Sequence, residues 1–157
     1  MKVLYDIHVM CNALAEHIKK LQSVQNAAAR LVTRTKKCEH ISPVLFQLHW
    51  LPVKERIKFK IVLFVFKILR SECPHYLQSL VDINIPRCAL RSSNKIILAR
   101  SDTRGTTVNY GHRAFSIAAP LLWNELPFDA HCLGWSCESF KSRLKTHLFR
   151  QCYSSYL

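Results

Sequence analysis

The fold is decided by residues 53–70, which read VKERIKFKIVLFVFKILR. Wound as a helix, this stretch is apolar over most of its circumference, which is typical of a helix at the centre of a domain. A narrow polar strip remains, formed by Arg56, Lys60, Lys67 and Arg70. The β-branched and aromatic residues also permit a strand, but the length and the strip favour a buried helix with a cationic edge.

Upstream, residues 18–32 have the periodicity of an amphipathic helix. One face is apolar, and we expect it to be buried: Ile18, Leu21, Val24, Ala28, Leu31 and Val32. The opposite face is polar and contains no acid: Lys19, Ser23, Asn26, Arg30 and Arg34. A polar link containing Lys36 and Lys37 follows. This face is either simply solvated or a cationic binding surface.

Shorter helices are expected on both sides of a basic loop. Ser42 and Pro43 favour a helix that ends near Trp50, and Pro74 opens another through Leu80. A further short helix is expected from Pro120 to Glu125. Ser136 is expected to cap the last helix, whose buried stripe comprises Phe140, Leu144, Leu148 and Cys152.

Residues 82–113 contain turn-forming clusters and many basic side chains. We expect an extended segment at 96–99 to pair with one at 113–117 as a small β-hairpin. The predicted fold class is therefore mainly α, a helical domain with this hairpin as a minor component. Its expected parts are a helical subdomain at 1–81, the basic loop and hairpin at 82–113, and C-terminal helices at 114–157 on the same core.

Composition favours a single globular domain with an anionic partner. The chain has 157 residues, is 49% hydrophobic and carries a net charge of +13. Such an excess of Lys and Arg attracts nucleic acid or an anionic membrane face, although it also fits a merely basic surface. Seven irregularly spaced cysteines, without a secretory signal, favour a reducing compartment, the nucleus or cytoplasm. The longest apolar run, residues 61–66, is far too short to span a membrane.

No catalytic signature occurs in the sequence. Polymerases need clustered carboxylates for two metal ions, and no adjacent Asp pair occurs here. Nucleophile-elbow, phosphate-loop and zinc-protease motifs are missing too. A zinc site is disfavoured, because His147 and Cys152 would diverge by about 140° on one helix. We therefore expect no enzymatic activity from this chain alone, no metal, no cofactor and no small-molecule substrate.

Four sequence blocks in a fixed order carry a family resemblance: LQSVQNAAARLV (21–32), LHWLPVKERI (48–57), GHRAFSIAAPLLWNELP (111–127) and SFKSRLKTHLF (139–149). Together they resemble the C-terminal region of reverse transcriptases of LINE-type (non-LTR, jockey-like) retrotransposons, over about residues 11–149. The resemblance implies a region beyond the polymerase thumb. It also implies that the chain lacks the catalytic part and that a polymerase domain is a possible partner.

The leading hypothesis is a noncatalytic reverse-transcriptase fragment that binds RNA or DNA nonspecifically through phosphates. Trp50 and Trp123 are expected in the core, whereas Tyr110 is the better candidate for stacking on bases. The candidate binding residues are Lys19, Arg30, Arg34, Lys36, Lys37, Arg91, Lys95, Arg100, Tyr110 and Arg113. The alternatives are a structural or docking module with no ligand of its own and, less favoured, attachment to anionic membranes.

Overall fold

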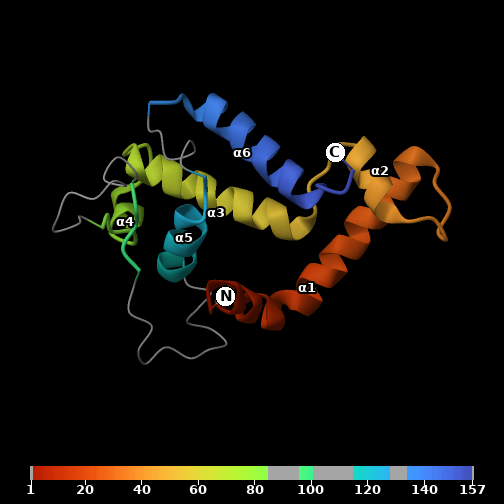
Figure 1. Cartoon of the computed structure of the whole chain (residues 1–157), viewed down its shortest axis with the longest axis horizontal. Coiled ribbons are helices and arrows are strands. Elements are labelled where there is room, and N and C mark those ends of the chain that lie inside the picture. The colour runs from red at the N-terminus through yellow and green to blue at the C-terminus, as the bar shows by residue number, and fades with distance from the viewer. Residues whose placement is uncertain (1, 85–95, 101–114, 128–133, 157) are drawn as a thin grey trace.

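The computed structural model describes residues 2–84, 96–100, 115–127 and 134–156, with side chains from Glu16 onward. These residues form helices α1 (Lys2–Thr33), α2 (Ile41–Gln47), α3 (Val53–Leu69), α4 (His75–Gln78), α5 (Phe115–Asn124) and α6 (Cys137–Cys152). Figure 1 shows their arrangement. The prediction of a mainly α protein is confirmed.

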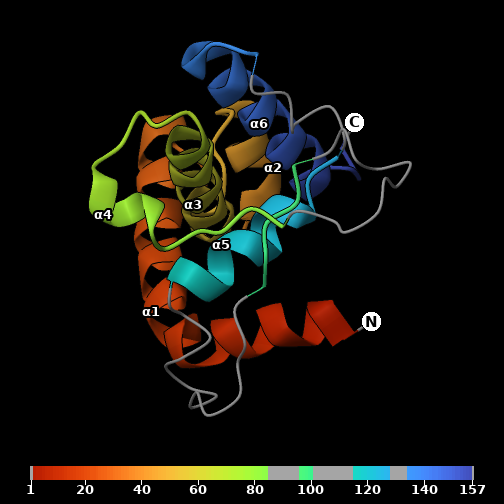
Figure 2. The same cartoon turned by 90° about the vertical axis from the view of Figure 1, so that its left-hand side faces the viewer.

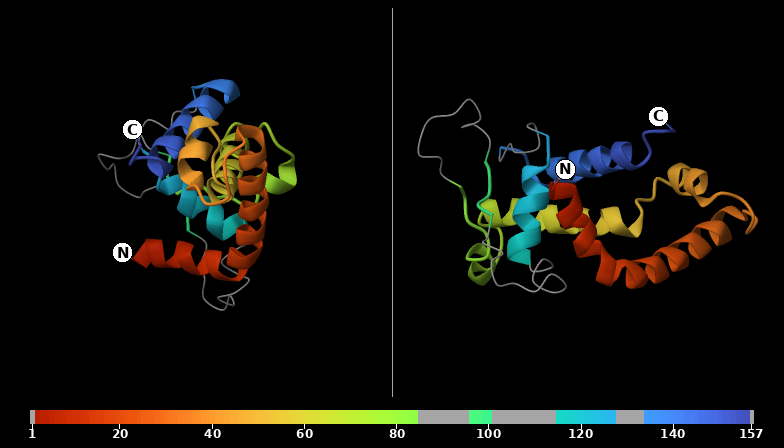
Figure 3. Two further views of the ribbon diagram at one scale, coloured as in Figure 1. Left: turned by 90° about the vertical axis from the view of Figure 1, so that its right-hand side faces the viewer. Right: turned by 60° about the horizontal axis from the view of Figure 1, so that its bottom comes forward.

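Helix α3 lies at the centre of the fold, as its all-round apolar sequence predicts. It packs against α1, α4, α5 and α6, and α6 runs alongside it in Figures 1 and 3. Val62, Val65 and Phe66 of α3 are buried. Packing on several sides explains why only a narrow polar strip remains on this helix.

The main core lies where α3, α5 and α6 meet. The rings of Phe66 and Phe140 stack with their centroids 4.0 Å apart and an interplanar angle of 8°. Trp123 of α5 lies with its ring centroid 6.2 Å from that of Phe140. All three side chains are almost completely buried. The prediction that Trp123 belongs to the core is confirmed.

The expected pairing of 96–99 with 113–117 is wrong in its described part, because Phe115 to Ile117 are helical and begin α5. The segment 96–100 lies instead beside residues 82–84, with one antiparallel bridge between Ile83 and Leu98. Two backbone hydrogen bonds of 2.8 Å flank it, from Asn84 N to Ile97 O and from Ala99 N to Asp82 O. No strand longer than this bridge occurs in the described residues, so the β-hairpin is not observed there.

Helix α5 explains why segment 96–100 pairs with residues 82–84 and not with 113–117. Seven consecutive residues from Ile117 to Trp123 are buried, whereas a strand at the edge of a sheet would expose every second side chain. The end of α5 also binds the backbone of the extended segment. Trp123 Nε1 donates to Ile96 O at 2.9 Å, and Asn124 bonds both Leu98 N and Leu98 O at 3.0 Å. The polar groups of segment 96–98 therefore find partners on a helix.

The last helix begins as expected. Ser136 Oγ accepts a hydrogen bond from Ser139 N at 3.2 Å, and Phe140, Leu144 and Leu148 are buried. Cys152 is exposed, however, so its assignment to the buried stripe is wrong. The chain leaves helical geometry at Tyr153, and that residue is buried in its place.

A second, smaller core joins α2 to α1 and to the C-terminal end. It is built on Ala29, Val44, Leu45 and Tyr153, with Phe46 packed between the rings of Phe149, Tyr153 and Tyr156. Helix α2 begins at Ile41, not after the expected cap Ser42, and its actual N-cap, His40, makes no side-chain hydrogen bond. Apolar contacts thus position α2, since capping bonds are missing at its start.

Tyr153 links this core to the turn before α3, and its ionisation should weaken the fold. Its hydroxyl donates to Trp50 O at 2.8 Å, and burial raises the pKa of Tyr153 to about 12. Because the folded pKa lies above the unfolded value near 10, this stabilisation is complete below about pH 10 and is lost toward about pH 12. Urea unfolding of the wild type and of Tyr153→Phe should therefore differ by about 1 kcal/mol at pH 8, and this difference should vanish and then reverse as the pH rises from about 10 to about 12.

The matched control is Tyr156→Phe, which changes an exposed tyrosine of the same segment. This variant should follow the wild type and keep its alkaline loss of stability. If Tyr153→Phe shows the same alkaline loss as the wild type, then the hydroxyl of Tyr153 is not its cause.

The predicted helix at 18–32 is confirmed as the C-terminal half of α1, which begins earlier, at Lys2, but the prediction of its buried face is wrong. Figure 2 shows that the helix is bent, with its N-terminal part turned below α5. Along its C-terminal part the buried residues are Gln25 and Ala29, whereas the expected stripe is largely exposed: Leu21 by 56%, Val24 by 67%, Leu31 by 82% and Val32 by 63%.

The edge of α1 that carries Gln22, Gln25 and Ala29 faces inward, because the two glutamines satisfy backbone groups of the turn into α3. Gln25 Nε2 donates to Leu51 O at 2.9 Å. Val53 N, at the first turn of α3, donates to Gln22 Oε1 at 2.9 Å. Helix starts leave such backbone N–H groups without an intrahelical partner. These two glutamines therefore position α1 and direct its apolar residues outward.

Candidate nucleic-acid interface

The first candidate site is a hollow beside the C-terminal half of α1, with a volume of about 530 Å³. Three cations line it, Lys19 and Arg30 from α1 and Lys37 from the loop that follows. The remaining lining residues are polar or small, and none is acidic: Gln22, Ser23, Asn26, Ala27 and Thr35. Three of the predicted binding residues are thus brought together around one hollow, which we call the α1 hollow.

The loop after α1 owes its position to Arg30. Helix α1 ends at Thr33, and Arg34 has a positive φ of 55°, which turns the chain back. Arg30 Nη2 donates to Glu39 O at 3.1 Å, and Arg30 O accepts from Thr35 N at 3.1 Å. Arg30 Nε is buried and has no hydrogen-bond partner among the described residues. The guanidinium is therefore held in place by its bond to Glu39 O.

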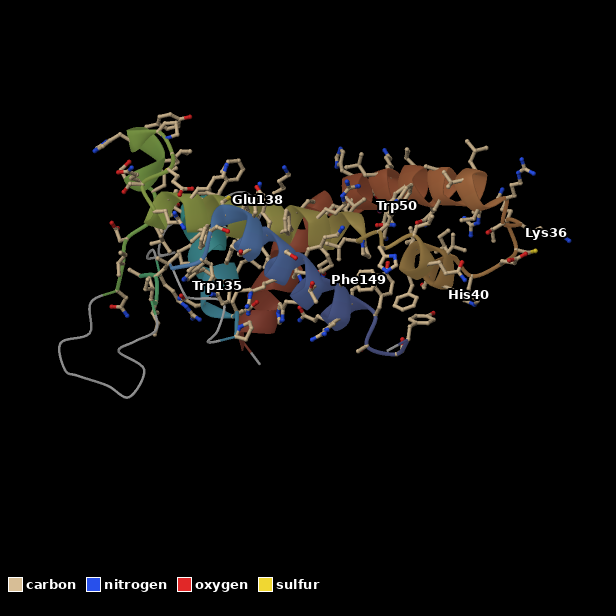
Figure 4. All side chains as sticks on the ribbon, turned by 90° about the horizontal axis from the view of Figure 1, so that it is seen from above. Lys36, His40, Trp50, Trp135, Glu138 and Phe149 are labelled. Carbon is tan, nitrogen blue, oxygen red and sulfur yellow. The ribbon has the colours of Figure 1, made fainter. Side chains whose placement is uncertain are left out.

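The other predicted binding residues are not all gathered here. Arg34 and Lys36 are exposed in the loop after α1, and Figure 4 places Lys36 at that end of the molecule, far from Trp135 and Glu138. Arg100 lies in the extended segment at the opposite end in Figure 1. The remaining candidates lie outside the described residues: Arg91, Lys95, Tyr110 and Arg113.

The positive charge of Arg100 affects the ionisation of Glu125, a carboxylate of the same chain. Burial raises the pKa of Glu125, at the end of α5, and the positive charges of Lys58 and Arg100 oppose that rise. Arg100 thus stabilises the charged form of Glu125. Arg100 does not line the α1 hollow, and its assignment as a binding residue stays a prediction.

A second basic hollow, which sequence reasoning missed, has a volume of about 460 Å³. Arg56 and Lys60 come from α3 and Lys145 from α6; the other lining residues are His49, Trp50, Leu51 and Phe59. We call it the α3–α6 hollow. Three cations stand here over an aromatic and apolar lining, again without an acid. No sequence signal joined Lys145 to the α3 strip, because only the packing of α6 on α3 does so.

Two of the three ring-bearing residues at this hollow, His49 and Trp50, lie in the turn before α3. His49 has a positive φ of 53°, and its ring stacks on Phe149 with centroids 5.6 Å apart. Trp50 is half-buried, so it is only partly the core residue that was expected. Figure 4 shows Trp50 near the middle of the molecule and Phe149 near it on α6.

The far end of the α3 strip has a structural role. Arg70 Nε pairs with Glu72 Oε1 at 2.7 Å, and Arg70 Nη1 donates to Trp135 O. This arginine therefore ties the end of α3 to the residue before the cap of α6. Of the predicted strip, only Arg56 and Lys60 reach the basic hollow.

Across the residues that the structure describes, no three His, Cys, Asp or Glu side chains gather in a way that could hold a metal ion. The zinc ligands that the sequence offers and that helix geometry disfavours are Cys132, Cys137, His147 and Cys152, and of these Cys132 lies outside those residues. None of the described helices combines the length and the apolar character needed to cross a bilayer. Comparison with protein-family models, curated proteins and solved structures finds no match to this chain.

Proposed function

We propose that this chain is a noncatalytic C-terminal part of a LINE-type reverse transcriptase and binds RNA or DNA through phosphates. The observation that supports this most is the presence of two hollows, each lined by three cations and by no carboxylate. With a net charge of +13, such surfaces favour a polyanion. The proposed compartment is the nucleus or cytoplasm.

The chemistry of each hollow suits a different part of a nucleic acid. In the α1 hollow, Lys19, Arg30 and Lys37 stand among neutral donors from Gln22 and Asn26. Such a set can contact phosphate and sugar oxygens without reading sequence. The α3–α6 hollow adds the rings of Trp50 and Phe59 to its cations, which suits an unpaired base.

The family resemblance supports the same role. Its blocks include the residues that position the site, since Gln22 and Gln25 lie in the first block and Arg56 in the second. None of the matching positions is a catalytic residue of that family. In this proposal the chemistry of polymerisation belongs to a separate polymerase domain, and this region contributes affinity for the template or the target.

The salt dependence of binding tests the proposal. If about six phosphates are engaged on duplex DNA, log K should fall against log[salt] with a slope of about −5. The double variant Lys19→Gln/Lys37→Gln should reduce that slope by about 2 and weaken binding at least about tenfold, because each lysine neutralises one phosphate. Fluorescence anisotropy with a labelled oligonucleotide over a salt series measures both quantities.

The matched control is Lys20→Gln, which removes an exposed lysine next to Lys19 that does not line the hollow. It should change the slope by well under one unit. If Lys19→Gln and Lys20→Gln change the slope and the affinity equally, then the α1 hollow is not a defined binding site and only diffuse surface charge attracts the oligonucleotide. Binding that does not respond to salt would overturn the proposed function.

A further inference from the structure

A third hollow is an apolar groove that lies between α1 and α3. It has a volume of about 780 Å³, and its walls are almost entirely apolar. Leu21, Val24 and Ala28 of α1 form one side, and Ile57, Ile61 and Phe64 of α3 the other. Trp50, Val53 and Phe115 complete it, with Gln25. We call it the α1–α3 groove.

The apolar side chains of the α1–α3 groove are exposed to an extent that indicates an interaction surface. Leu21 is 56%, Val24 67% and Phe64 48% exposed. Single exposed apolar residues are ordinary, but a contiguous patch marks an interaction surface. The glutamine contacts of α1 fix this orientation, so the groove follows from how α1 is docked on α3.

The shape of the groove suits a helix. The α3 wall runs from Val53 to Phe64, which at 1.5 Å per residue is roughly 16 Å, or three helical turns. A helix laid between two others presents residues spaced by three and four to both walls.

The charges around the groove select the kind of helix. Arg56 and Lys60 line it and no acid does. A second copy of the chain would bring another net charge of +13, and like charges disfavour that pairing. The complementary occupant is a helix with an apolar stripe and acidic flanks.

We propose that the α1–α3 groove binds an acidic amphipathic helix of another polypeptide. Leu21, Val24 and Phe64 receive its apolar stripe, and Arg56 and Lys60 pair with its carboxylates. Since Arg56 and Lys60 also line the α3–α6 hollow, docking neutralises two of the three cations there. The α1 hollow does not share them.

The test uses a labelled peptide of about four helical turns, with leucines spaced by three and four and glutamates elsewhere. A scrambled peptide of the same composition and a version with lysine for glutamate are the controls, and fluorescence anisotropy against the full chain is the readout. The amphipathic acidic peptide should bind at least about tenfold more tightly than either control. Equal binding of the scrambled peptide would overturn the proposal, because it would show attraction by net charge alone.

Leu21→Ser and Phe64→Ser should each weaken binding of the acidic peptide about tenfold, the loss expected when one apolar anchor is removed. Leu31→Ser is the matched control, since Leu31 is on the same helix, is 82% exposed and does not line the groove. Unchanged affinity in both groove variants overturns the proposal, as does co-sedimentation with anionic vesicles without peptide binding. Oligonucleotide binding through the α1 hollow should persist in Leu21→Ser, which separates this outcome from the proposed function.

Discussion

Replacing Trp123 with alanine is expected to lower the free energy of unfolding by about 3–5 kcal/mol. The indole is fully buried between α3 and α6 and lies beside the stacked rings of Phe66 and Phe140. Removing it leaves a cavity that these aromatic rings cannot close without leaving their own contacts. It also leaves Ile96 O without the bond from Trp123 Nε1. Urea denaturation followed by circular dichroism measures the loss.

Two further variants separate the causes. Trp123→Phe keeps most of the packing and loses the bond to Ile96 O, so about 1–3 kcal/mol is expected. Trp135→Ala is the matched control: Trp135 is half-buried, and its ring lies 4.3 Å from the guanidinium carbon of Arg143. Its loss should cost about 1 kcal/mol. If Trp135→Ala costs as much as Trp123→Ala, the core does not centre on α5.

Asn124→Ala is expected to cost about 2–4 kcal/mol and to release the extended segment 96–100 from α5. One side chain bonds both Leu98 N and Leu98 O at 3.0 Å, and Leu98 is only 1% exposed. Removing the amide leaves both backbone groups unsatisfied in a buried position, at about 1–3 kcal/mol each. Hydrogen exchange at the Leu98 and Ala99 amides should accelerate, because the pairing with residues 82–84 depends on this anchor.

Asn124→Asp refines this result. At neutral pH the carboxylate can still accept from Leu98 N but repels Leu98 O, so the variant should be no more stable than Asn124→Ala. Protonation of the introduced carboxylate at acid pH should restore part of the lost free energy of unfolding. Asn26→Ala is the control, because Asn26 bonds only Gln22 on the surface of α1, and about 0.5 kcal/mol is expected. Unchanged exchange at Leu98 in Asn124→Ala would contradict the role assigned to this side chain.

Much of the helical architecture was predictable from local pattern. The burial of α3 and the capping of α6 by Ser136 depend on residues close together in the chain, so periodicity and cap chemistry were sufficient. The α1 hollow was partly predictable for the same reason, since Lys19, Arg30 and Lys37 belong to one helix and the loop that follows it.

Three features were not predictable from pattern. Amphipathicity assigned the wrong inner face to α1, because Gln22 and Gln25 bond backbone groups far along the chain. Segment 96–99 was given the wrong partner, because Asn124 and residues 82–84 satisfy its backbone. Lys145 was not associated with Arg56 and Lys60, because that meeting requires α6 to lie on α3.

The amino-acid sequence by itself determined that the chain is mainly helical, where α3 and α6 lie and that it carries a strong positive charge, whereas α1 and α5 begin earlier than their patterns predict. Hydrophobic periodicity and charge are properties of neighbouring residues, and they hold before any helix meets another. Only the tertiary structure decided which side of α1 faces inward, and with it the basic hollows and the apolar groove. The inner side of α1 is set by hydrogen bonds from Gln22 and Gln25 to backbone groups of the turn before α3. Those backbone groups lose water, and need a partner, only when the two helices pack together.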